Sequence, residues 1–128
     1  MTDRLIAAAR EAQAQAYAPY SKFRVGAALE AMDGTIFLGC NVENASYGLT
    51  ICAERAAVCA AIRAGARQFR RAVVASQVDP PAAPCGACRQ VLAEFGLDLP
   101  IDGVGPTQAV RWRLSELLPD AFGPEQLR

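Results

Sequence analysis

A short connection near the C-terminus constrains the fold of this chain more than any other feature. Two apolar segments, residues 99–105 and 109–114, have the composition of β-strands, and only about "GPTQ", residues 105–108, joins them. A parallel crossover needs roughly a dozen or more residues, so we expect these two strands to be antiparallel.

Three segments have the composition of helices. Residues 3–16 are rich in strong helix formers and contain neither glycine nor proline. Residues 52–64 have the same character and stop at Gly65, which can act as a C-cap. The run "CGACRQVLAEF", residues 85–95, predicts a third helix that ends before Gly96.

The remaining segments supply strands and turns. Residues 23–42 are apolar on both sides of the Asp-Gly signal in "MDGT", which predicts a β-hairpin with its turn at residues 32–35. Residues 71–76 predict a short buried strand, and residues 115–119 a last turn of helix. The three prolines of residues 77–84 exclude regular structure between that strand and the third helix.

These elements predict a three-layer α/β/α fold. The order of hairpin, helix, strand, helix and strand pair favours helices on both sides of a mostly buried, five-stranded mixed sheet, with the last strand antiparallel. With 128 residues, of which 52% are hydrophobic, the chain fits a single domain over residues 1–128.

Charge and hydropathy argue against two classes of partner. The 13 basic and 13 acidic residues balance, so no basic patch for a phosphate backbone is expected, and nucleic acid is disfavoured. No uninterrupted apolar run approaches the roughly 20 residues that span a bilayer, and the first residues carry no secretory pattern. We therefore expect a cytoplasmic protein that binds no membrane.

The cysteines indicate a metal site. The chain has five cysteines and no histidine, so any zinc ligands must be thiolates or carboxylates. Cys85 and Cys88 have the C-x-x-C spacing at the first turn of a predicted helix, and Cys52 lies at the start of another. A helix N-terminus favours the thiolate form that metals bind, so these three cysteines are the expected ligands of one Zn²⁺ per chain.

The other two cysteines are expected to pack in the core. Cys59 follows Cys52 by seven residues, about 10 Å along a helix, so both cannot bind one ion. Cys40 lies in a predicted strand. Three protein ligands and one open position are typical of a catalytic zinc rather than a structural one.

Glu54 is the candidate catalytic residue. It follows Cys52 by two residues, and a carboxylate beside a zinc-bound water can act as a general acid and base. Two alternatives remain open: Glu54 could face solvent and pair with an arginine, and "CGAC" alone could be a redox dithiol.

Several blocks of the sequence resemble the cytidine deaminase family, in its small homotetrameric class with three cysteine ligands. They are "GCNVENASYG", "TICAER" and "PCGACRQVLAEF", together with "PYSKFRVGAAL" and "LLPDAFGP". The resemblance implies hydrolytic deamination of cytidine and 2'-deoxycytidine to uridine and 2'-deoxyuridine, with release of ammonia, in pyrimidine salvage. It also implies that zinc activates a water for attack on C4 and that Glu54 shuttles the protons.

The resemblance further implies contacts with the nucleoside inside one chain. Phe23 and Ala53 would contact it, although the bare sequence leaves ordinary core packing as an alternative for Phe23. Asn41 and Glu43 would bind the ribose hydroxyls; being two residues apart in an extended segment, they share one face.

Other residues would act from neighbouring chains or behind the metal. By resemblance, Ala45, Tyr47 and Phe122 reach the active sites of neighbouring subunits, which predicts a homotetramer with shared sites. Three thiolates leave Zn²⁺ with a net charge of −1, and Arg55 is expected to offset it by hydrogen bonding to the ligand sulfurs, oriented by Gln90.

Other functions are weighed against this one. A structural zinc module would need a fourth ligand, and a thiol redox protein would hold no metal. Among related deaminases, those acting on blasticidin S or on nucleic acids are the nearest alternatives, but "NVENASYG" favours cytidine and the neutral charge favours a free nucleoside.

Overall fold

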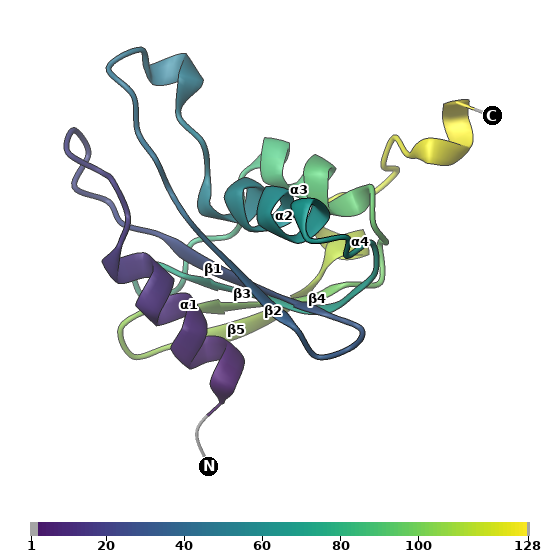
Figure 1. Ribbon diagram of the computed structural model, residues 1–128, viewed down its shortest axis with the longest axis horizontal. Coiled ribbons are helices and arrows are strands. Elements are labelled where there is room, and N and C mark those ends of the chain that lie inside the picture. The colour runs from purple at the N-terminus through teal and green to yellow at the C-terminus, as the bar shows by residue number, and fades with distance from the viewer. Residues whose placement is uncertain (1–2, 128) are drawn as a thin grey trace.

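The computed structural model describes residues 3–127 and contains a five-stranded sheet with helices on both faces (Figure 1). The strands are β1 (Gly26–Ala31), β2 (Ile36–Cys40), β3 (Phe69–Ala75), β4 (Pro100–Val104) and β5 (Ala109–Arg113). Their order is β2-β1-β3-β4-β5; β3 and β4 are parallel and every other neighbouring pair is antiparallel. The predicted mixed sheet with an antiparallel last strand is confirmed.

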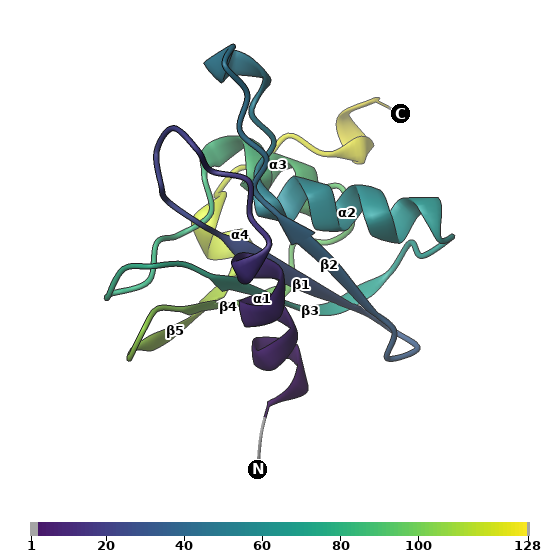
Figure 2. The ribbon, with the colours of Figure 1, turned by 60° about the vertical axis from the view of Figure 1, so that its left-hand side comes forward.

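Four α-helices cover the sheet. They are α1 (Arg4–Ala14), α2 (Ala53–Arg63), α3 (Gly86–Ala93) and the single turn α4 (Leu114–Leu117), and 3₁₀ turns occur at Tyr47–Leu49 and Pro124–Leu127. Helix α1 lies on one face, and α2, α3 and α4 lie on the other (Figures 1 and 2). This arrangement confirms the predicted three layers. Within residues 3–127, no helix is both long enough and apolar enough to cross a bilayer.

The hydrophobic core is divided between the two faces of the sheet. Ala27 and Leu29 of β1 pack with α2, α3 and α4, whereas Ala28 packs with α1. Successive side chains of a strand point to opposite faces, so one strand serves both layers. The result is that β1 and β3, at the centre, are buried on both sides.

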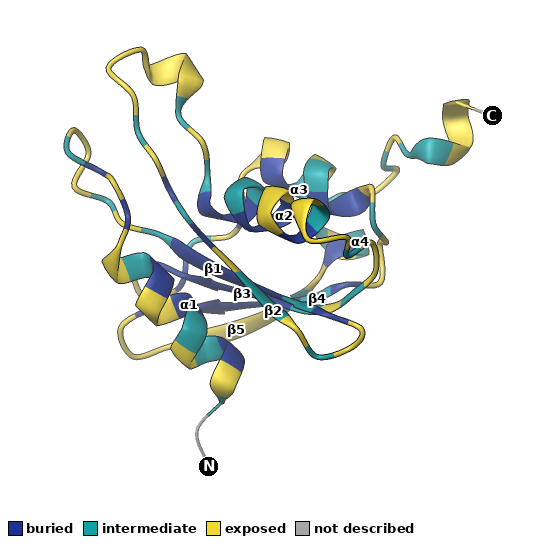
Figure 3. Cartoon of the chain, in the orientation of Figure 1, coloured by how far each residue is buried: buried dark blue, intermediate teal, exposed yellow. Residues whose placement is uncertain are grey.

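The outer strands depart from the prediction of a mostly buried sheet. β5 is largely exposed and β2 is mostly half-buried, while the central strands are buried (Figure 3). The helices contact mainly the central strands and β2, which leaves β5 beside only the short α4. The prediction therefore holds for the centre of the sheet and is wrong for its edges.

Both cysteine packing predictions also need correction. Cys59, expected in the core, is exposed on α2, because the buried side of that helix is formed by other residues. These are Ala53, Glu54, Ala57, Val58 and Ala61. Cys40 is half-buried at the end of the edge strand β2.

Two glycines allow helices to approach the sheet closely. A Cβ on Gly26 would lie 2.1 Å from the Ala9 carbonyl oxygen of α1. A Cβ on Gly39 would lie 2.3 Å from the Ala53 carbonyl oxygen, at the start of α2. The second contact presses the first turn of α2 against the sheet, and that turn carries part of the candidate site.

Candidate metal centre and substrate cavity

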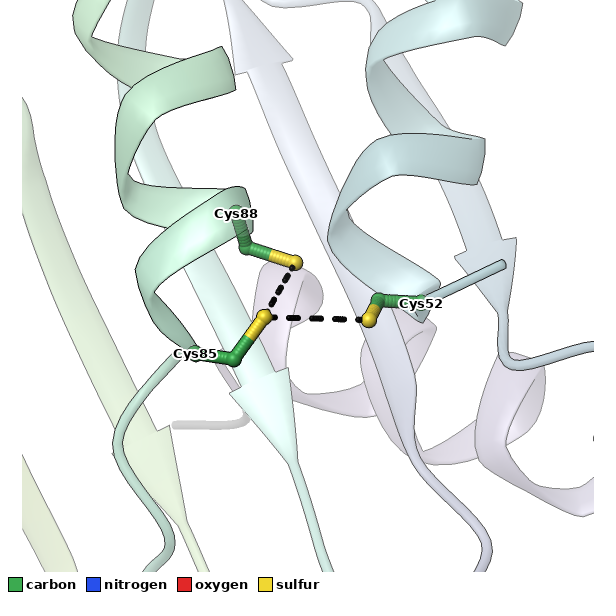
Figure 4. Close-up of side chains that lie close together, drawn as sticks. All are labelled: Cys52, Cys85 and Cys88. Atoms are coloured by element: carbon green, nitrogen blue, oxygen red, sulfur yellow. Dashed lines mark hydrogen bonds between the residues drawn. The ribbon is translucent and has the colours of Figure 1, made fainter. Parts of the chain in front are cut away.

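Two helix N-termini bring three cysteines together. Cys52 is the N-cap of α2 and Cys85 the N-cap of α3, both with extended backbone, and Cys88 lies in the first turn of α3. Neither N-cap thiol accepts a capping hydrogen bond from a backbone N–H of its own helix, and both sulfurs point toward the space between the helices (Figure 4). The unpaired N–H groups at both termini favour anionic sulfur there.

The spacing of the sulfurs fits a tetrahedral zinc. The Sγ atoms of Cys52 and Cys85 are 3.9 Å apart, those of Cys85 and Cys88 are 3.5 Å apart, and all three lie within 4.8 Å of one another. Tetrahedral bonds of about 2.3 Å place ligand sulfurs about 3.8 Å apart. Among residues 3–127, no other cluster of three or more potential ligands is found.

The thiols interact strongly even without metal. A hydrogen bond with the Cys88 thiol lowers the pKa of Cys52 to about 5, with further contributions from Arg55 and Cys85. The same interaction, together with burial, raises the pKa of Cys88. The cluster therefore already holds a thiolate at neutral pH, which is the form a metal ligand requires.

Arg55 lies behind this cluster, as predicted. Its Nη2 atom donates to the Cys52 Sγ at 3.6 Å and to the Thr50 carbonyl oxygen at 3.2 Å. Its Nε atom is buried and has no hydrogen-bond partner among the described residues. A spare donor beside three sulfurs fits a site whose thiols ionise when a metal binds, because the sulfurs then become stronger acceptors.

Gln90 does not make the contact expected of it. Its Nε2 atom donates to the carbonyl oxygen of Phe122 at 2.9 Å, so it holds the C-terminal tail rather than Arg55. A role for Gln90 in orienting the arginine stays a prediction.

Glu54 is buried next to the cluster. Only 8% of its surface is exposed, which rules out the alternative of a solvent-facing glutamate. Burial raises the pKa of its carboxyl group, and the nearby Cys52 thiolate acts in the same direction. A buried carboxyl group with a raised pKa holds a proton more readily than an exposed one, which suits a general acid and base.

A cavity of about 230 Å³ opens in front of these groups. Six of the predicted site residues line it: Phe23, Asn41, Cys52, Ala53, Glu54 and Cys85. The sequence reasoning missed six others: Val25, Thr50, Val74, Ser76, Ala82 and Ala83. Thr50 could have been found from its position two residues before Cys52, whereas Val74 and Ser76 come from the end of β3, which no local signal connects to the metal site.

Asn41 and Glu43 both face the segment before β1, consistent with their predicted common face. The Asn41 side chain accepts a hydrogen bond from the Val25 N–H at 2.9 Å and donates to the Phe23 carbonyl oxygen at 2.8 Å. Glu43 does not line the cavity; its carboxylate accepts from the backbone N–H groups of Tyr20 and Ser21. A hydrogen bond from the Ser21 hydroxyl, together with these backbone bonds, lowers the pKa of Glu43.

The three residues expected to reach neighbouring subunits do not line the cavity of their own chain. Tyr47 is 72% exposed and Phe122 is 56% exposed, and Ala45 is exposed as well. Ala45 and Tyr47 belong to the segment that projects from the body before α2, and Phe122 lies in the tail near the C-terminus (Figure 1). The Tyr47 ring lies edge-on to the ring of Tyr20, at 5.8 Å between centroids.

Comparisons with known proteins agree with this site. Residues 1–100 match the family model described as the cytidine and deoxycytidylate deaminase zinc-binding region. A cytidine deaminase of Sporosarcina psychrophila is 46% identical, covering 98% of this chain and 93% of the relative, and one of Mycobacterium tuberculosis is 49% identical, covering 93% and 87%. The crystal structure of cytidine deaminase from Burkholderia pseudomallei superposes with a TM-score of 0.90 at 50% identity, covering 95% of this chain and all of that one.

The matched region contains the whole metal centre. Cys52, Glu54, Cys85 and Cys88 all fall within residues 1–100, and the similarity to the relatives extends over nearly the full chain. On this evidence, the chain belongs to the cytidine and deoxycytidylate deaminase family.

Proposed function

We propose that this protein is a zinc-dependent deaminase that hydrolyses cytidine and 2'-deoxycytidine to uridine and 2'-deoxyuridine with release of ammonia. The observation that carries this proposal is the meeting of three cysteine thiols and the buried Glu54 at one end of a cavity. The names of the similar proteins, which are cytidine deaminases, support the choice of substrate.

Cys52, Cys85 and Cys88 would hold one Zn²⁺ per chain, next to the cavity that Cys52 and Cys85 line. When bound, zinc supplies a Lewis acid that makes a water molecule nucleophilic at neutral pH. The Cys52 thiolate and the two helix N-termini are already suited to hold the ion.

Glu54 would carry the protons of the reaction. It accepts one proton from the attacking water and delivers it to ring N3 of the pyrimidine. It then takes the proton of the new C4 hydroxyl group and passes it to the amine, which leaves as ammonia when the C4–N bond breaks and the C4 carbonyl forms. Burial raises its pKa, which makes the carboxyl group a better proton acceptor than an exposed glutamate.

The cavity walls would orient the nucleoside. Phe23, Val25 and Val74 offer apolar surface to the base, and packing there excludes bulk water from the reacting atoms. Ala53, at the first position of α2, lies between Cys52 and Glu54 and would contact the base with its backbone. Asn41, which lines the cavity, and Glu43, which lies just outside its lining, would bind the ribose hydroxyls.

We further propose a homotetramer whose sites are completed by other chains. The cavity volume of about 230 Å³ lies below the roughly 300–1,000 Å³ usual for ligand pockets. Ala45, Tyr47 and Phe122 are exposed on projecting segments, where they could close the cavity of another copy. Exposed aromatic rings of this kind are typical of protein interfaces.

In the cell, the protein would act on free nucleosides in pyrimidine salvage, in the cytoplasm. The formal net charge of zero supports a small neutral substrate rather than a polynucleotide. The following test separates this function from two alternatives. One is deamination of a related cytosine nucleoside such as blasticidin S, and the other is a purely structural zinc site.

The test compares the wild type with Glu54→Gln. Glutamine keeps the shape of the side chain but cannot shuttle a proton, so we expect about one zinc per chain in both proteins and a loss of kcat by about 10²–10⁴-fold in the variant. Zinc is measured by elemental analysis, and turnover by the absorbance change as cytidine becomes uridine. If the wild type and the variant both bind zinc and neither converts cytidine, a structural zinc site is favoured. If the wild type converts only blasticidin S, the substrate is that nucleoside and not cytidine.

A further inference from the structure

The cavity wall formed by residues 20–25, here called the wall segment, has no regular structure of its own. It carries Phe23 and Val25 into the cavity before the chain enters β1. A segment outside helices and strands needs other partners for its backbone N–H groups, and these partners determine where its side chains stand.

The first part of the wall segment depends on Glu43. Its carboxylate accepts from the N–H groups of Tyr20 and Ser21, at 3.1 and 3.2 Å, and from the Ser21 hydroxyl. The Ser21 Oγ atom in turn accepts from the N–H of Phe23 at 3.0 Å.

Lys22 has an unfavourable backbone conformation in this arrangement. Its φ of +62° lies in the left-handed region, which is unfavourable for a residue with a side chain. Such a conformation persists only when surrounding contacts determine it, and Lys22 directly precedes Phe23. The position of the Phe23 ring therefore depends on the bonds on both sides of this residue.

The second part of the wall segment is held from two strands. Asn41, at the end of β2, accepts from the Val25 N–H at 2.9 Å. Gln77, two residues after the end of β3, accepts from the Arg24 N–H at 2.8 Å through its Oε1 atom. The N–H groups of residues 23, 24 and 25 thus each donate to a different side chain.

Gln77 has no part in the site described above. It is exposed and does not line the cavity, but its neighbour Ser76 does, and β3 is the central strand that leads into it. Its bond to Arg24 is the one that ties the wall segment to the β3 side of the cavity. A rigid strand end is a good anchor, because β3 pairs on both sides.

We infer that Gln77 is a positioning residue for the nucleoside: through the backbone of Arg24, it holds Phe23 and Val25 in the place where they contact the substrate. This inference rests on the proposed function. Because the wall would contact the base and sugar rather than the reacting bond, loss of the tie weakens ground-state and transition-state binding alike. KM then rises while kcat stays the same.

The experiment compares three variants of the zinc-loaded protein. Gln77→Leu removes the acceptor at similar size, whereas Gln77→Glu keeps an oxygen that can accept from Arg24. Gln68→Leu makes the same change at an exposed site at the other end of β3, where the side chain forms no hydrogen bond with the described residues. The measurements are KM and kcat for cytidine, uridine affinity by calorimetry, and hydrogen exchange of the Arg24 amide.

We expect Gln77→Leu to raise KM and the uridine Kd by about three- to tenfold, the factor for one lost hydrogen bond, with kcat unchanged. The Arg24 amide should exchange faster in that variant alone, and Gln77→Glu should restore both values. A wild-type KM in Gln77→Leu, or equal effects in Gln68→Leu, would overturn the inference. A wild type that neither converts cytidine nor binds uridine would instead overturn the proposed function on which it rests.

Discussion

Arg55 shows how a single residue can adjust the chemistry of the metal centre. Its guanidinium contacts the Cys52 sulfur and the carbonyl oxygen of Thr50, which also lines the cavity. Three thiolates would leave Zn²⁺ with an excess negative charge that weakens it as a Lewis acid. By this contact the arginine would offset part of that charge and hold the sulfur in place.

At the residue scale, we predict that Arg55→Ala loses zinc to a chelator faster than the wild type and lowers kcat by about 10–100-fold. The variant leaves the ligand charge uncompensated and frees the Cys52 side chain. Chelator competition and cytidine turnover measure the two effects. Arg63→Ala, an exposed position at the other end of α2, is the control, and equal behaviour of the two variants would refute the role of Arg55.

At this scale, the sequence predicted the residues whose spacing along the chain fixes their relative positions. The C-x-x-C spacing and the start of a helix identified Cys52, Cys85 and Cys88, and the structure brings their sulfurs together. It could not find Gln77, because nothing in the sequence around Gln77 refers to a backbone N–H 53 residues away. The prediction that Cys59 is buried was wrong, because the sheet against which a helix packs decides which side of the helix is buried.

At the element scale, Gly39 determines how α2 sits on the sheet. A Cβ there would lie 2.3 Å from the Ala53 carbonyl oxygen and 2.4 Å from the Ala57 nitrogen, and both are helix backbone atoms that cannot swing aside. The same turn of the helix carries Cys52 and Glu54. The positions of Cys52 and Glu54 therefore depend on the absence of a side chain at residue 39.

We predict that Gly39→Ala lowers stability by about 1–3 kcal/mol and also weakens zinc binding, because α2 must move away from β2. Gly26→Ala is the matched control. Its Cβ would lie 2.1 Å from the Ala9 carbonyl oxygen, so it should cost similar stability, but it displaces α1 on the other face. Urea unfolding and zinc titration of both variants decide the point; equal zinc affinities would contradict it.

A network of charges joins the elements on the α1 side of the sheet. Asp102 of β4, only 8% exposed, accepts from Arg71 of β3 and from Arg111 of β5, and Arg71 also donates to Asp3, the N-cap of α1. The hydrogen bonds from Arg111 and Arg71 lower the pKa of Asp102, and the bond from Arg71 lowers that of Asp3. One helix and three strands are thereby linked.

This network predicts a pH dependence of stability. The folded protein binds protons at these carboxyl groups less readily than the unfolded chain, so their stabilising effect is complete above about pH 5 and is lost as the pH falls below about 4. Asp102→Asn should be about 1–3 kcal/mol less stable than the wild type at pH 7 and lose less on acidification. Urea unfolding of reduced, zinc-free protein between pH 3 and 7 measures this, and parallel curves for the two proteins would contradict it.

At the scale of the whole molecule, two aromatic side chains are exposed instead of packing in the core of their own chain. Tyr47 and Phe122 are largely exposed, on segments that leave the body at two different points (Figure 1). In the proposed tetramer, each would enter the active site of another copy. One functional pocket would then contain residues of more than one chain.

We predict that Glu54→Gln and Phe122→Ala chains, each weakly active alone, recover activity when folded together. A pocket with an intact Glu54 from one chain can then receive an intact Phe122 from the other. A mixture of Glu54→Gln and Glu54→Ala chains is the control, since none of its pockets is complete. Turnover and sedimentation are measured together, and an active monomer or absent recovery would overturn the shared site.

The sequence by itself determined the features that depend on neighbours along the chain. The helices, the hairpin and the antiparallel last pair follow from composition, glycine and proline signals and one short connection, and the structure differs mainly by one or two residues at their ends. The metal ligands follow from cysteines at helix starts. In all of these, the interacting groups lie within a few residues of one another or the connection is too short to allow an alternative.

Only the tertiary structure decided the contacts that join distant segments. These include the parallel pairing of β3 with β4, the outward face of Cys59, the carboxylate of Glu43 on the wall segment, and the tie from Gln77 to Arg24. Each depends on how the layers pack, which is a property of the whole core. Backbone N–H groups and charged side chains bond to whatever groups packing brings close to them, so no local sequence pattern predicts which partner each will have.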